Sequence, residues 1–162
     1  MNKAKCRVVP VLVAATTLLA LVGSAGAAAG APAKAKKSCE LLIPAEITAA
    51  FGTESGDGTQ KGNDCAWRVG DLVVSLNLTT KGAKSRFESL RDLAEKAGAQ
   101  PRKVTGVRDK AVYAEIQSFK ELLVLKGKKF LFLRVLDIAS PTDTETAKAA
   151  LTDLAKKAVK RV

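Results

Sequence analysis

Two stretches of this 162-residue chain decide its fold: Ser38-Cys39-Glu40-Leu41-Leu42-Ile43-Pro44-Ala45-Glu46 and Asp64-Cys65-Ala66-Trp67. Proline suits the first turn of a helix, where its missing N–H has no intrahelical partner, so Pro44 predicts a helix start. Residues 53–64 are rich in Gly, Thr, Asp, Asn and Ser, which indicates a loop. If Cys39 and Cys65 are bonded, the bond ties a short helix to the first strand of a sheet.

Residues 1–27 have the pattern of a secretory signal peptide. Lys3, Lys5 and Arg7 precede an apolar run over 8–22, and Ala25-Gly26-Ala27 is a small-x-small cleavage site. The run is shorter than the about 20 apolar residues of a membrane span. We predict a secreted, extracellular protein cleaved after Ala27 or Ala29, not an integral membrane protein; the alternative is a retained N-terminal anchor. Residues 28–37 then form a flexible basic linker, and residues 38–162 form a single domain.

Export sets the chemistry of the cysteines. Cys6 leaves with the signal peptide, so the mature chain keeps Cys39 and Cys65 in an oxidising compartment, where an even pair predicts a disulfide. Such a bond stabilises the fold by roughly 3–4 kcal/mol in the chain-entropy model. A redox pair or a metal site is the alternative, but the chain has no Cys-x-x-Cys and no histidine. We therefore predict no metal site.

Residues 72–80 form the clearest strand. Leu72, Val74, Leu76 and Leu78 alternate with Val73, Ser75, Asn77 and Thr79, which predicts one packed face and one wetter face. Arg134 interrupts an apolar run in a later strand, where it either reaches the end of the sheet or lines a concave surface. The candidate ligand-binding residues are Ser75, Asn77, Thr79 and Arg134.

The remaining pattern completes an α+β fold. A helix is predicted over 83–97, strands over 111–116, 122–126 and 129–138, and a final helix after Pro141 with Thr142 and Glu145 as its capping box. A short strand over 65–69 and the strand at 72 form a hairpin across Gly70-Asp71. The order is α-β-β-α-β-β-β-α. We expect an antiparallel sheet of about four to five strands with helices packed on one face and one disulfide.

The sequence argues against most enzyme classes. Without histidine, a Ser-His-Asp or Cys-His arrangement is impossible, and no nucleophile elbow, phosphate loop or dinucleotide fingerprint is present. Pairs of carboxylates lack a context that would raise a pKa. The seven aromatic residues are not interleaved with the basic ones, as nucleic-acid binding by stacking requires. We predict a protein that is not an enzyme, has no cofactor and binds no nucleic acid.

The motifs of the chain resemble those of a known family. Cys39-Glu40-Leu41-Leu42-Ile43-Pro44, Cys65-Ala66-Trp67 and Gly106-Val107-Arg108-Asp109-Lys110-Ala111 are similar to the signature of small secreted proteins and lipoproteins of actinobacteria with a domain of unknown function. That family is similar in plan to extracellular sensor domains of mycobacterial receptor kinases. The resemblance covers about residues 38–160 and implies an α+β domain with a Cys39–Cys65 disulfide and no catalysis. Ile43 stands where the family has a capping hydroxyl, and Arg108 replaces a turn glycine.

Three functions follow from these observations. The leading one is an exported, non-enzymatic, sensor-like domain that binds a small ligand or partner at the cell envelope. The alternative uses the charge of +8 that remains once residues 1–27, with three basic and no acidic residues, are removed. Such a protein is held to anionic cell-wall polymer or lipid by charge. The third is a carboxylate-based hydrolase, which requires a deep cleft holding two acids.

Overall fold

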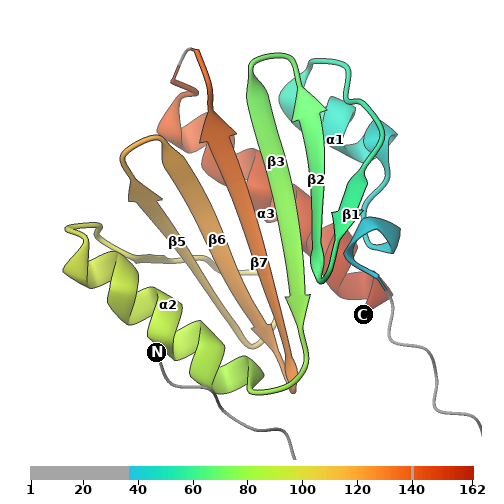
Figure 1. Cartoon of the computed structure of the whole chain (residues 1–162). Helices are drawn as coiled ribbons and strands as arrows, with labels where there is room; N and C mark the ends of the chain where they lie inside the picture. The colour runs from blue at the N-terminus through green and yellow to red at the C-terminus, as the bar shows by residue number, and fades with distance from the viewer. Residues whose placement is uncertain (1–36, 140) are drawn as a thin grey trace, which may run out of the picture. The chain divides into compact units, whose positions relative to one another are not determined.

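Seven antiparallel strands form one sheet in a computed structural model that describes residues 37–139 and 141–162 (Figure 1). The predicted signal peptide, and the linker up to residue 36, lie outside the described residues. The sheet order is β1-β2-β3-β7-β6-β5-β4. The strands are β1 (Thr59–Lys61), β2 (Asp64–Val69), β3 (Leu72–Thr79), β4 (Arg102–Lys103), β5 (Lys110–Ile116), β6 (Phe119–Lys126) and β7 (Lys129–Asp137).

Helices cover both faces of this sheet. The described helices are the 3₁₀ turn η1 (Ser38–Glu40), α1 (Pro44–Phe51), α2 (Ala83–Lys96) and α3 (Thr144–Arg161). Leu151 and Leu154 of α3 belong to the core that contains Leu122 and Val124 of β6. Phe87 of α2 belongs to a second core, which contains Leu123 and Leu125 of the same strand. Because successive residues of a strand point to opposite faces, α3 and α2 lie on opposite sides of the sheet (Figure 1). We call these sides the α3 face, where α1 also packs against α3, and the α2 face.

The α+β class and the disulfide are confirmed, and two details of the predicted fold are wrong. The sheet has seven strands rather than four to five, because the short β1 and β4 extend its two edges. Helices pack on both faces rather than one. The central strands are apolar on both sides, with Phe130 in the α2-face core and Leu131 in the α3-face core, so each side needs its own cover.

The Cys39–Cys65 disulfide ties η1 to β2 on the α3 face. Cys65 and Trp67 are buried in the α3-face core, so the tie is part of the packed interior. The N-cap of helix α1 is Ile43, which offers no capping hydroxyl, as the sequence indicates. The Glu46 side chain accepts the Ile43 N–H at 3.1 Å, and Arg161 of α3 forms a salt bridge with Glu46 at 2.6 Å. The start of α1 is therefore fixed from the far end of the chain.

Two-residue turns join four pairs of neighbouring strands. The first central residue of each has a positive φ: Gly62 between β1 and β2, Gly70 between β2 and β3, Gln117 between β5 and β6, and Gly127 between β6 and β7. Glycine adopts this left-handed conformation without strain, but glutamine does not. Arg108, which replaces a glycine of the resembled family, also has a positive φ of 55°. The backbone there keeps the left-handed conformation in spite of the arginine.

Helix α3 starts one residue later than its predicted capping box implies. Asp143, not Thr142, is the N-cap, and its carboxylate accepts the backbone N–H of Thr146 at 2.9 Å. Thr142 instead donates its hydroxyl to Asp137 at 2.7 Å.

Among the described residues, no helix is both long and apolar enough to cross a membrane.

Candidate functional site

One half of the α2 face carries no helix. Helix α2 packs over β5, β6 and β7, which leaves β1, β2 and β3 uncovered on that side (Figure 1). The alternating burial of β3 directs its even-numbered apolar residues into the α3-face core and its odd-numbered residues to this side. We call this surface the open face. Its residues from β2, β3 and β7 are Asp64, Ala66, Arg68, Val73, Ser75, Asn77, Thr79, Arg134 and Leu136.

Arg134 lies on β7, at the edge of the open face, between two aromatic rings. Its guanidinium carbon is 4.8 Å from the centroid of the Phe119 ring and 4.9 Å from that of Phe132. Its Nε and Nη2 both reach the same carboxylate oxygen of Glu121, at 2.8 and 2.7 Å. The Glu121 side chain is 7% exposed and that of Arg134 is 37% exposed. A buried carboxylate and two rings therefore hold the guanidinium in one orientation at the surface.

A second polar group lies beside it on β2 and β3. The side-chain amide of Asn77 donates to the Asp64 carboxylate at 3.0 Å, and the Thr79 hydroxyl donates to the side-chain oxygen of Asn77 at 2.8 Å. This chain of hydrogen bonds fixes the Asn77 side chain. The hydroxyl of Ser75 is half-buried and makes no side-chain hydrogen bond with the part of the chain that the structure describes.

The structure brings all four predicted ligand-binding residues onto one surface. Ser75 and Arg134 are direct partners across the β3–β7 pair, and Asn77 and Thr79 follow on the same side of β3. Of the two positions considered for Arg134, the end of the sheet is wrong, since its pairing with Ser75 lies in the middle of both strands. Whether these residues bind a ligand stays a prediction.

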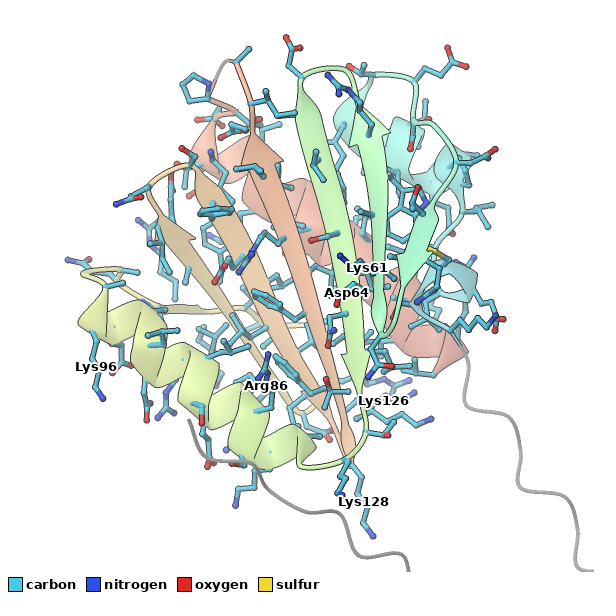
Figure 2. The ribbon with its side chains drawn as sticks, viewed as in Figure 1. Lys61, Asp64, Arg86, Lys96, Lys126 and Lys128 are labelled. Carbon is cyan, nitrogen blue, oxygen red and sulfur yellow. A yellow bond between two sulfur atoms is a disulfide. The ribbon has the colours of Figure 1, made fainter. Side chains whose placement is uncertain are left out.

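An open hollow of about 790 Å³ adjoins this group. It lies between the β1–β2 hairpin, β3 and α2, and Figure 2 shows Arg86 reaching from α2 toward the sheet, with Lys61 and Asp64 on the same side. Asn77 and Thr79 complete its polar lining. The hollow places two cations beside the predicted residues.

Sequence reasoning missed several of these side chains. Glu121 had a usable signal, because a hairpin turning at Gly127-Lys128 pairs position 121 with position 134. Lys61 and Arg86 had none. Lys61 lies in a strand of three polar residues, and the position of Arg86 depends on which face α2 covers.

A second hollow, of about 540 Å³, lies at the start of α3 and contains a buried ion pair. Lys120 and Asp137 form this pair, and their side chains are 2% and 6% exposed. Burial alone raises the pKa of Asp137, but the Lys120 ammonium and the Thr142 hydrogen bonds outweigh burial and lower it. Both groups are satisfied within the fold, so this hollow has a structural explanation.

The described residues hold their polar and titratable groups within the fold. They contain no group of three or more side chains able to hold a metal ion and no buried polar side-chain atom without a partner. Hydrogen bonding to Arg161 lowers the pKa of Glu46, and the Thr146 N–H lowers that of Asp143. Burial raises the pKa of the Tyr113 phenol to about 12, so it stays protonated. Glu46 and Asp143 are therefore charged and Tyr113 is neutral at neutral pH.

Comparison with protein-family models, with curated proteins and with solved structures found no match for this chain. The resemblance to the actinobacterial family therefore remains a prediction that rests on the quoted motifs.

Proposed function

We propose that this protein is an exported, non-enzymatic domain that binds a carboxylate-bearing ligand or partner on the open face at the cell envelope. The observation that carries the proposal is the geometry of Arg134. Its contacts to Glu121 use Nε and Nη2, which leaves the N–H groups of Nη1 without a hydrogen bond among the described residues. Those groups can donate to an incoming acceptor.

Preorganisation favours binding at this point. Arginine side chains lose considerable rotamer freedom when they bind, but Glu121, Phe119 and Phe132 have already restricted Arg134. The Ser75 hydroxyl, on the neighbouring strand, supplies a second donor. A planar carboxylate matches this pair of donors better than a spherical ion does.

The charge around the site favours an anionic ligand. Glu121 neutralises Arg134, but Lys61, Arg68 and Arg86 add three cations to this side, against the single carboxylate of Asp64. The excess of positive charge attracts anions and raises the rate of encounter.

The test is a titration followed by amide NMR. The probes are N-acetylated tripeptides with a free α-carboxylate, and the same peptides with an amidated C-terminus. We expect the acids to shift amide signals in β3 and β7 around Ser75 and Arg134, and the amides to bind about tenfold or more weakly, because a charge-assisted hydrogen bond is worth about 1.5–3 kcal/mol.

Two variants locate the interaction. Arg134→Lys keeps a cation for Glu121 but loses the planar fork, so the fold persists and binding falls about tenfold or more. Arg91→Lys, on the exposed side of α2, is the matched control and leaves binding unchanged. Equal binding by acids and amides, or full binding by Arg134→Lys, contradicts the proposal.

The alternative function, attachment to anionic cell-wall polymer or lipid by net charge, differs in its response to salt. Binding through fixed donors in a partly desolvated site persists in part at high ionic strength, whereas attachment by net charge alone is lost once exposed charges are screened. A salt series on the same titration therefore separates the two.

A further inference from the structure

Six cations without a side-chain hydrogen bond among the described residues gather at one end of the sheet; a seventh cation there, Lys126, donates to the backbone oxygens of Val159 and Val162. The six lie in or beside three connections: the turn from β3 to α2, the loop from β4 to β5 and the turn from β6 to β7. We call this surface the basic end. Its residues are Lys81, Lys84, Arg108, Lys110, Lys128 and Lys129.

The topology explains why these residues lie together although they are distant in sequence. The strands β3, β7, β6 and β5 are consecutive in the sheet, and all four have this end in common. Thr79 pairs with Phe130 and Lys110 pairs with Leu125, so the three connections leave adjacent strand ends. The Asp109 carboxylate accepts the Gly127 N–H at 2.7 Å, which joins the β4–β5 loop to the β6–β7 turn.

The cations of the basic end have no described carboxylate partner. None of the six forms a salt bridge in the part of the chain that the structure describes. Five of them are exposed and Lys129 is half-buried. Asp109 is the one acidic residue within the three connections, and the hydrogen bond to Gly127 engages it. Their charge is therefore available to a partner.

The opposite end of the sheet differs when only residues inside the connections are counted, which at the basic end are the cations Lys81, Arg108 and Lys128 and the acid Asp109. Its connections are the turns at 70–71 and 117–118 and the segment 138–143, which contain Asp71 and Asp143 and no lysine or arginine. The domain is thus polarised along its strands.

We propose that the basic end docks on a bilayer that contains anionic lipid, with the strands directed away from the membrane surface. Three of the cations lie in neighbouring connections and the other three lie in the helix and strand ends beside them, an arrangement that meets a plane. A flexible polymer chain is instead tracked by a groove lined with charge. Five of the six are lysines, which act as point charges toward phosphate and do not need a fixed geometry.

The entry of the chain into the domain agrees with this orientation. Ser38 donates its hydroxyl to the backbone of Asn63 in the β1–β2 turn, and the Asp64–Asn77 pairing places that turn at the same end of the sheet. Lys37 directly precedes Ser38, and Lys34 and Lys36 precede it in the sequence. In this orientation the open face points sideways and stays accessible. The inference does not depend on the function proposed for that face.

The test is co-sedimentation of the exported protein with vesicles of phosphatidylcholine alone or mixed with phosphatidylglycerol. Each cation near an anionic surface strengthens binding by about fivefold. We therefore expect Lys128→Gln to weaken binding to the mixed vesicles about fivefold, and Lys110→Gln combined with Lys128→Gln about 25-fold. Lys96→Gln, at the far end of α2, removes the same charge and serves as the matched control (Figure 2).

The possible outcomes decide the question. The proposal is supported if the protein binds mixed vesicles more strongly than phosphatidylcholine vesicles and if this binding falls with salt above about 0.1 M. Lys128→Gln should also reduce the binding, and Lys96→Gln should not. Equal losses in the two variants mean that net charge alone attracts the protein, and overturn it. Equal binding to both vesicle types overturns it, as does binding to soluble polyphosphate without binding to vesicles. Arg134→Lys should bind vesicles as the wild type does, so failure of one proposal leaves the other standing.

Discussion

Replacing Lys120 with methionine removes one partner of a buried ion pair and keeps most of the side-chain volume. Asp137 then remains almost completely buried, with the hydrogen bonds of Thr142 but without a countercharge. Loss of one member of such a pair destabilises proteins by about 3–5 kcal/mol. The retained Thr142 hydrogen bonds place the expected loss near the lower end, at about 3 kcal/mol at pH 7.

Protonation of Asp137 sets an upper limit on this loss. Protonating a carboxyl with the ordinary pKa of 3.8 at pH 7 requires about 4.4 kcal/mol. The unpaired charge therefore cannot lower the variant's free energy of unfolding by much more than this amount. In the wild type the lowered pKa of Asp137 contributes stability above pH 3.8, and this contribution is lost as the pH falls below that value. In the variant, protonation near pH 4 is nearly free. The penalty that the variant carries for the unpaired charge should therefore shrink to less than about 1 kcal/mol at pH 4, so the difference between the two proteins should be smaller at pH 4 than at pH 7.

Urea unfolding at pH 7 and pH 4 measures both free energies. Lys128→Met, at an exposed turn position, is the control and should change the free energy of unfolding by less than about 0.5 kcal/mol. Lys120→Met combined with Asp137→Leu should recover stability to within about 1.5 kcal/mol of the wild type, since no charge is left buried. A loss that is the same at both pH values, or below about 1 kcal/mol at pH 7, refutes this account of the pair.

Three further predictions concern stability. Gln117→Gly should raise the free energy of unfolding by about 1 kcal/mol in urea, because it relieves a positive φ of 53°; no gain would mean that the backbone there is unstrained. Gly58→Ala should lower the thermal midpoint, because a Cβ there would lie 2.5 Å from Nε1 of Trp67 and 2.7 Å from Sγ of Cys65; the expected loss is about 1–3 kcal/mol, and an unchanged midpoint would contradict the close packing. Reduction of the Cys39–Cys65 bond, which spans 26 residues, should cost about 3.5 kcal/mol, measured by urea unfolding with and without reductant; equal midpoints would show that the reduced chain stays equally constrained.

The sequence predicts the central strands and helices of this fold but not the two edge strands of the sheet. Strand β3 and helix α3 follow from their apolar periods, and the hairpin across Gly127 follows from its turn residue. Strands β1 and β4 are two or three residues long and polar throughout, so they have no period to detect. Apolar residues on both sides of β7 already required cover on both faces.

The candidate site divides in the same way. The alternation in β3 predicts a shared face for Ser75, Asn77 and Thr79, and the structure shows that face without a helix. The pairing of Ser75 with Arg134 joins strands that are far apart in the sequence, and no local pattern encodes such a crossover. The surroundings of Arg134 depend on that pairing, which is why its contact with Glu121 and two rings did not emerge from residue types alone.

The central position of β7 fixes the order in which this sheet can be completed. β7 is the last strand to be synthesised, yet it lies between β3 and β6 and pairs with both. Until residues 129–137 have left the ribosome, nothing joins the two halves of the sheet, and β3 and β6 each present an unpaired edge. The contacts that close the sheet, from Thr79 with Phe130 to Leu72 with Asp137, are distant in sequence and form slowly. A chain that stops short of β7 is therefore a pair of exposed strand edges prone to aggregate, not a smaller version of the same fold.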